Sequence, residues 1–461
     1  MKKYLALFIG MLFVLGFAAT AFAIHAEIPS ETQAVIAKGA TQITLGGEIR
    51  VRGEFKQNTS DFNSDKVDRS SAWDQRVRFS VEAKVSPNTT GFIQLESGGA
   101  DNNDNVTWGS YGADGATGLY PVGNAKHGDV RILQAWILHQ GSGLLGVPAL
   151  VKVGHMPITL GTGLFLDHSK FGDDALLLGV DPVKNMHIIG ATIKFKEGLE
   201  TATTGVKFND DSNAYALIFA YDFDKKSSVG FDATYLDHQK FAGAAPNWSD
   251  LHLWNFGLRG NTNIAGLGLK VDVEMQTGKV ENTTTLDFSG FAVTAGLSYK
   301  LAPVTLSLDF AYGSGDDKAD NKIKTFITSL GKDQHYTYVY EYRTPTAGTK
   351  GVSGGLANTM YIKAGGNADV TKDVNVDLGV YFLQAAKKYY GDPQLATTAT
   401  TPPSKNIGTE VDARITYKID KNLKYWVEGG YLFAGNYWKV VTGGTSPDDA
   451  YAIRHGIMLS F

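Results

Sequence analysis

Residues 46–56, GGEIRVRGEFK, alternate in character with a period of two. Ile49, Val51 and Phe55 form an apolar set, and the intervening positions carry charges, namely Glu48, Arg50, Arg52, Glu54 and Lys56. Successive side chains of a β-strand point to opposite faces, so this strand would have one apolar face and one densely charged face. A soluble antiparallel sheet also alternates, with its polar face in bulk water. A strand face with this many charges therefore contacts bulk water, a partner or an enclosed aqueous space.

The same alternation recurs along the chain. It is clear at residues 76–85, 267–276, 291–300, 304–312, 374–382, 410–418 and 451–461. Weaker candidates lie at 91–97, 130–140, 150–156, 188–196, 214–223, 229–236, 251–260, 360–368 and 423–433, and the tyrosine-rich residues 335–343 fit a strand or a loop. We expect roughly 16 to 18 strands of about 10 residues, the length that spans a bilayer when tilted. The predicted fold class is all-β, a transmembrane up-and-down antiparallel β-barrel.

The expected connections are of two kinds. Tight turns are predicted at 86–88, 224–226, 301–303 and 420–422, and long polar loops at 98–129, 159–185, 313–334, 344–358, 387–407 and 442–449. Short turns on one side and long loops on the other are typical of an outer-membrane barrel.

The N-terminus reads as a secretory signal. Lys2 and Lys3 precede an apolar run, and residues 21–23, AFA, fit a small-x-small cleavage site. We therefore predict a signal peptide at 1–23, a short N-terminal periplasmic segment at 24–40 and a barrel with long extracellular loops at 41–461. Residues 33–38 would form a short helical or coiled piece. The expected location is the bacterial outer membrane.

Composition supports export and narrows the function. The chain has no cysteine, so thiolate-bound metals and covalent haem are excluded. Its formal net charge of −4, which loss of Lys2 and Lys3 would make −6, argues against a nucleic-acid partner. No later segment offers about 18 uninterrupted apolar residues, the length a transmembrane helix needs.

Aromatic residues gather near the ends of the predicted strands on the apolar register. These are Tyr299, Phe310, Tyr312, Tyr417, Tyr431, Phe433 and Phe461. Aromatic girdles at both interfaces mark outer-membrane barrels. The last residue, Phe461, also resembles the C-terminal signature through which such barrels meet the barrel-assembly machinery, which we expect as a partner together with outer-membrane lipid.

Four stretches resemble the alginate-export family of outer-membrane barrels. They are LGGEIRVRGEF, VKVGHMPITLGTG, AYGSGDDKADNKIKTF and GTEVDARITYKIDKNLKYWVEGGYLFAG. The resemblance covers anchor points along most of the chain. It implies a single-chain barrel of about 18 strands, and many members of the family work as porins.

The charged register identifies candidate pore-lining residues, because a charge facing lipid at the bilayer midplane costs about 2–4 kcal/mol. They are Glu48, Arg50, Arg52, Glu54, Lys56, Arg76, Arg78, Glu82, Lys84, Lys270, Asp272, Glu274, Asp309, Glu410, Asp412, Arg414 and Arg454. If the first two strands pair, four arginines share one wall, and the carboxylates Glu410 and Asp412 are expected among their counterparts. Two interpretations stay open: a salt-bridged ladder that fixes the barrel shape, or a basic wall facing an acidic wall that orients solutes.

Enzyme motifs are absent: there is no HExxH, GxSxG or P-loop sequence, and no Ser–His pair stands on the interior or rim register. We expect no enzyme activity and no cofactor. Acidic loops at 101–105, 209–213 and 316–321 could bind Ca²⁺ through oxygen ligands, but none has the spacing of a known calcium loop.

The nearly balanced charges favour a porin for small polar solutes and ions with weak selectivity. A dedicated channel for an anionic polysaccharide or another specific anion, and a barrel that sheathes a periplasmic partner, remain alternatives. A homo-oligomer also stays open.

Overall fold

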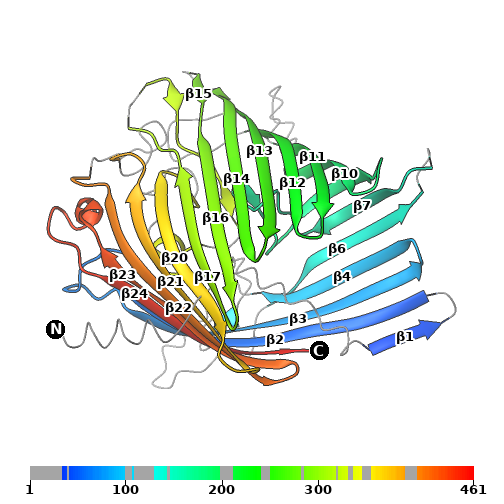
Figure 1. Cartoon of the computed structure of the whole chain (residues 1–461), viewed down its shortest axis with the longest axis horizontal. Coiled ribbons are helices and arrows are strands. Elements are labelled where there is room, and N and C mark those ends of the chain that lie inside the picture. Colours follow the sequence, from blue (N-terminus) through cyan, green and yellow to red (C-terminus); the bar gives the residue numbers. More distant parts are fainter. Residues whose placement is uncertain are drawn as a thin grey trace, which may run out of the picture.

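The computed structural model describes residues 34–38, 41–98, 106–107, 129–142, 146–197, 211–239, 250–281, 285–317, 320–330, 336–344, 355–389 and 402–461. In these residues the chain forms a closed antiparallel barrel of 18 strands, as predicted (Figure 1). In the described part of the chain, no helix is long and apolar enough to cross a membrane.

The barrel strands follow each other around the wall in sequence order. They are β2 (Thr41–Gln57), β3 (Ser70–Ser86), β4 (Thr89–Gly98), β6 (Asp129–Gly141), β7 (Ala149–Met156), β9 (Asp173–Val180), β10 (Met186–Lys196), β11 (Ser212–Asp224), β12 (Ser227–Gln239), β13 (Asp250–Ile264), β14 (Leu267–Glu281), β16 (Phe291–Leu301), β17 (Val304–Gly313), β20 (Thr359–Asp369), β21 (Val374–Ala385), β22 (Asn406–Asp420), β23 (Leu423–Ala434) and β24 (Ala450–Ser460).

The barrel closes where β24 pairs with β2. The register runs from Glu48 opposite Ser460 to Gln57 opposite Tyr451. Phe461 completes the seam, since its N–H donates to the Gly47 carbonyl at 3.0 Å and its carbonyl accepts the Gly47 N–H at 2.6 Å. Closure removes the unpaired sheet edges that cannot exist in hydrocarbon.

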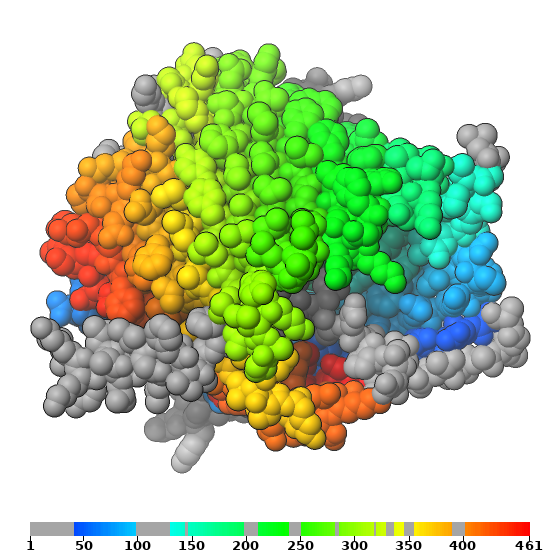
Figure 2. All heavy atoms as spheres, in the orientation of Figure 1, coloured from blue at the N-terminus to red at the C-terminus, as the bar shows by residue number. Residues whose placement is uncertain are grey.

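The outer face of the wall is apolar, as the alternation predicted. On β2 and β3, Ile49 and Val77 are 43% and 40% exposed, whereas Glu48 is only 3% exposed. Six of the seven predicted aromatic positions are exposed as well, among them Tyr299, Tyr417 and Phe433, whereas Tyr312 is half-buried. In the space-filling view, strands β12–β17 form a continuous outer wall (Figure 2).

The two ends of the barrel differ as expected. Four predicted tight turns are present at 87–88, 225–226, 302–303 and 421–422. The predicted long loop at 159–185 is wrong in part, because it contains β9 and the two-residue strand β8 (Leu166–Asp167). Its DDALLLGV stretch has a continuous apolar run instead of strict alternation, so the period-two pattern missed it.

Three shorter elements also depart from expectation. Residues 34–38 form a strand, β1 (Ala34–Lys38), which pairs with β2 rather than forming a helix or coil. The tyrosine-rich segment contains a short helix, α2 (Tyr340–Arg343). Small strands β5 (Val106–Thr107), β15 (Leu286–Phe288), β18 (Lys322–Ile323) and β19 (Ser329–Leu330), and the 3₁₀ helix η1 (Asn436–Val440), lie in the long connections.

The long connections fold inward and pack against the wall. In one interior cluster, residues of the segments 156–166 and 323–327 pack against the inner face of β9–β17. Met156, Ile323 and Phe326 of this cluster are fully buried. A second cluster joins Phe62, Tyr340 and Trp438 to the inner face of β21–β24. The Phe62 and Trp438 rings stack with centroids 4.0 Å apart. Apolar residues therefore face outward to the membrane region and also fill part of the interior.

Candidate functional site

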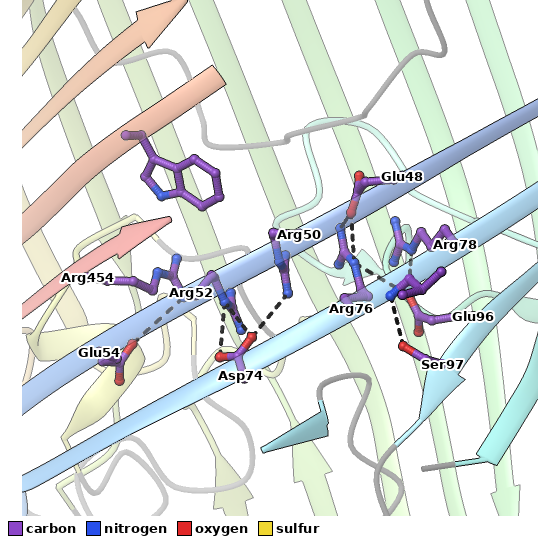
Figure 3. A network of polar contacts seen from close by, with 12 residues as sticks. Glu48, Arg50, Arg52, Glu54, Asp74, Arg76, Arg78, Glu96, Ser97 and Arg454 are labelled. Atoms are coloured by element: carbon purple, nitrogen blue, oxygen red, sulfur yellow. Dashed lines mark hydrogen bonds and ion pairs between the residues drawn. The ribbon is translucent and has the colours of Figure 1, made fainter. Parts of the chain in front are cut away.

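A charged network lies on the inner face of the wall around the seam. It is built by β22–β24 and β2–β4, whose inward positions alternate with the exposed apolar ones. β2 and β3 pair, with Arg50 opposite Arg76, so the condition for a shared arginine wall is met. Figure 3 shows these side chains on one side of the two neighbouring strands.

Each arginine of this network contacts a carboxylate. Arg76 bonds Glu48 at 2.6 Å, Arg52 bonds Asp74 at 3.0 Å and Arg78 bonds Glu96 at 2.5 Å. These ion pairs separate the guanidinium groups, which would otherwise repel one another. All of these residues except Asp74 and Glu96 are among the candidate pore-lining residues. The prediction missed Asp74 because it began that strand at Arg76.

Several carboxylates in this network each contact two arginines. Asp74 lies 3.0 Å from Arg52 and 4.0 Å from Arg50, and Glu96 lies 2.5 Å from Arg78 and 3.8 Å from Arg76. Further around the wall, Glu428 bonds Arg454 at 2.7 Å and Arg414 at 3.3 Å.

Glu54 is shared by Arg343 at 2.6 Å and Arg454 at 3.9 Å. Among the described residues, the network contains more arginines than carboxylates: Arg50, Arg52, Arg76, Arg78, Arg343, Arg414 and Arg454 against Glu48, Glu54, Asp74, Glu96 and Glu428. This network of ion pairs therefore carries a net positive charge.

Acidic residues dominate a second inner patch, on β12–β14. Asp232, Asp272 and Glu274 are each 1% exposed and surround the single guanidinium of Arg259. Asp272 also accepts the Thr162 hydroxyl at 2.5 Å, which ties the segment before β8 to the wall. The patch carries more negative than positive groups.

The remaining predicted residues fall into three places. Lys270 bonds Asp309 at 3.0 Å on β14 and β17, with Lys363 of β20 at 3.9 Å from the same carboxylate. Glu82 and Lys84 are exposed at the turn end of β3. Lys56 is half-buried at the opposite end of β2.

Glu410 and Asp412 were expected among the counterparts of the arginines, but the hydrogen bonds that they accept come from a loop. Glu410 accepts the backbone N–H groups of Val339 and Tyr340, at 2.5 Å and 2.8 Å. Asp412 accepts the Tyr338 N–H at 3.0 Å. Sequence periodicity placed both carboxylates inside the barrel but could not reveal that a distant loop folds onto them.

Arg343 was missed because it lies in the tyrosine-rich segment rather than on an alternating strand. Its guanidinium lies 3.8 Å from the ring centroid of Tyr338 and 4.0 Å from that of Tyr342. Contacts this close contribute favourable cation–π energy. Burial raises the pKa of Tyr338, despite the two nearby arginines, so its hydroxyl stays protonated.

The structure also brings together a serine and a histidine at the rim, where the sequence predicted no Ser–His pair. The Ser212 hydroxyl and the His238 ring nitrogen Nδ1 lie 2.6 Å apart at the long-loop ends of β11 and β12. Ser212 is only 3% exposed, however, so a substrate has no direct access to this hydroxyl. The statement that no Ser–His pair stands on the rim is therefore wrong.

The acidic loops give no support for a calcium site. In the described parts, no group of three or more His, Asp or Glu side chains has an arrangement suited to a metal ion. Asp316 accepts the Lys324 N–H at 3.1 Å and lies 3.7 Å from the Lys324 ammonium. A hydrogen bond from Lys324 to Asp320 raises the pKa of Lys324. Residues 101–105 lie outside the described residues, as does the predicted signal peptide at 1–23.

The alginate export family matches residues 201–451, more than half of the chain. The chain belongs to the alginate export family. No curated protein matches this sequence.

Solved structures share the fold of this family member at low sequence identity. OccK8 (OprE) of Pseudomonas aeruginosa is 10% identical with a TM-score of 0.53, over 91% of this chain and 98% of that chain. OccAB1 of Acinetobacter baumannii is 12% identical with a TM-score of 0.54, over 90% and 96%. A BenF-like porin from Pseudomonas fluorescens Pf-5 is 11% identical with a TM-score of 0.54, over 91% and 99%. This alginate export family member therefore has the barrel fold of outer-membrane porins.

Proposed function

We propose that this barrel is an outer-membrane channel for passive diffusion of small hydrophilic solutes and ions, with weak charge selectivity. The proposal rests on how side chains are distributed across the barrel wall: apolar residues cover the outside, and charged residues are concentrated on the inside. An apolar outer band around a polar interior is the arrangement of water-filled outer-membrane barrels. The candidate pore-lining residues belong to this proposal.

Weak selectivity follows from how the charges are distributed. The ion-pair network around the seam carries a net positive charge, and the patch around Arg259 carries a net negative charge. Rings and walls of charge set ion preference in a pore, and opposite signs at the two walls offset each other. Such a field orients polar solutes without excluding either sign of ion.

Purified protein in planar bilayers tests this function. We expect stable channels and reversal potentials that show only a small preference between cations and anions. Absence of conductance would contradict the channel function, and strong selectivity for one sign of ion would contradict the balanced interior.

A dedicated channel for an anionic polysaccharide or another specific anion is the second candidate. The excess of arginines around the seam and membership of the alginate export family favour it. This channel would show low conductance that polyuronate blocks, whereas a diffusion porin would keep its conductance in the presence of the polymer.

A further inference from the structure

The tyrosine-rich segment 336–344 is bound to the inner face of the barrel at several points. Its first turn lies against β22, where Glu410 and Asp412 accept three consecutive backbone N–H groups. Glu410 is fully buried and Asp412 is 7% exposed. These carboxylates are therefore occupied by the segment and are closed to solutes.

The chemistry of this contact explains why two acidic residues lie two positions apart on one strand face. The free N–H groups at the start of a short helix carry partial positive charge, and charged acceptors form stronger hydrogen bonds than neutral ones. The N-cap residue Val339 offers no side-chain acceptor, so Glu410 supplies acceptors for the Val339 and Tyr340 N–H groups. Without them, buried backbone donors would be left unpaired.

Through its other contacts, the segment spans six neighbouring strands. Tyr336 stacks on Tyr361 of β20 with centroids 4.9 Å apart. At the far end, Arg343 bonds Glu54 of β2 through two nitrogens, at 2.6 Å and 3.3 Å. Between β20 and β2 the wall runs through β21, β22, β23 and β24. The segment therefore narrows the interior along this part of the wall.

We propose that Glu410 and Asp412 are positioning residues that hold segment 336–344 as a fixed constriction, and that this segment determines the size of the passage. The proposal rests on the channel function proposed above. It assigns the segment and its two anchoring carboxylates a role in solute selection that the charged network by itself does not supply.

The first experiment measures single-channel conductance of Glu410→Gln, Asp412→Asn and the double variant. Each oxygen of Glu410 accepts one backbone N–H, so in Glu410→Gln the single amide oxygen serves only one of them and the NH₂ group opposes the other donor. Asp412→Asn removes the negative charge that strengthens the bond from the Tyr338 N–H, so the double variant weakens the anchor most. We expect a roughly twofold or greater rise in the conductance of the double variant, because part of the constriction leaves the lumen. Asp377→Asn is the matched control, since the Asp377 carboxylate accepts from the Asn367 side chain on the same wall and not from the segment.

The second experiment measures release of the segment without relying on transport. The chain has no cysteine, so Tyr342→Cys introduces a single thiol into the segment. We expect slow labelling by a polar maleimide in the parent. Labelling should be roughly tenfold faster in the double variant, which corresponds to about 1.4 kcal/mol of easier local opening.

The two measurements separate the possible failures. Unchanged labelling in the double variant would overturn the anchoring role. Faster labelling with unchanged conductance would overturn the role of the segment in setting passage size. If the parent protein does not conduct at all, the channel function fails, while the labelling result still decides whether the carboxylates hold the segment.

Discussion

Arg343 and Glu54 are joined by a two-point ion pair across 289 residues of sequence, with their closest atoms 2.6 Å apart. Arg343 lies at the end of a short helix inside the barrel, and Glu54 lies on the first barrel strand. The Arg343 side chain is 3% exposed and the Glu54 side chain 24% exposed. This pair thus fastens an inward loop to the seam region of the wall.

Loss of this ion pair should destabilise the barrel. For Arg343→Ala we expect a drop of about 2–4 kcal/mol in the free energy of unfolding, because one partner of a largely buried pair remains. Lys270→Ala is the control, since the Lys270 side chain is 63% exposed and its pair with Asp309 should contribute only about 0–1 kcal/mol. Urea titration in lipid vesicles measures both. Equal losses in the two variants would show that burial does not set the strength of these pairs.

Removal of two adjacent arginines should change ion preference. Arg50→Ala combined with Arg76→Ala takes two positive charges from the inner wall and leaves Glu48 without its 2.6 Å partner. We expect the reversal potential to move toward cation preference. Lys84→Ala, at the exposed turn end of the same strand β3, should cause a smaller shift. If the double variant behaves like the parent, these arginines do not face the conducting path.

Gly313 tests how closely an inward loop approaches the wall. A Cβ atom added there would lie 1.8 Å from the backbone oxygen of Leu356, so Gly313→Ala must displace the loop or the strand. We expect a loss of about 1–3 kcal/mol or more. Gly260→Ala is the matched control, because its Cβ would meet the Ser228 oxygen at 3.6 Å, an ordinary contact. Thermal unfolding in detergent compares the two; similar melting temperatures would argue against tight packing at Gly313.

Acid should loosen the loop 58–69. Burial disfavours the charged form of Asp68, but hydrogen bonds from the Ser60 hydroxyl and from the Ser60 and Asn58 N–H groups outweigh it and hold the pKa of Asp68 below its ordinary value. Because the folded-state pKa is lowered, the stabilisation is present above the unfolded pKa of about 3.9 and is lost as pH falls through the folded value.

Amide hydrogen exchange of the loop between pH 6 and pH 2.5, corrected for the intrinsic pH dependence of exchange, measures this loosening. Asp68→Asn should already show weakened protection at pH 6, and its protection should change less with acid. Asp65→Asn, at an exposed position of the same loop, serves as the control. Identical pH profiles for Asp68→Asn and the parent would refute the assignment to Asp68.

The sequence by itself determined the wall of this protein. Strand alternation is a local property: in Ile49, Val51 and Phe55 against Arg50 and Arg52, each residue's face follows from its neighbours two positions away. Tight turns such as 302–303 can also be predicted from sequence, because turn residues and strand ends are adjacent in sequence. The fold class and the outward apolar face needed nothing more.

Only the tertiary structure decided which interior groups meet. Glu410 and Asp412 had the right face but the wrong expected partners, because their donors lie about seventy residues away in a loop without strand periodicity. Arg343 was missing from the predicted network because it lies in the same loop, which has no strand periodicity. Which loop folds inward depends on packing summed over distant residues, such as Phe62 against Trp438, and no short-range pattern in the sequence encodes that sum.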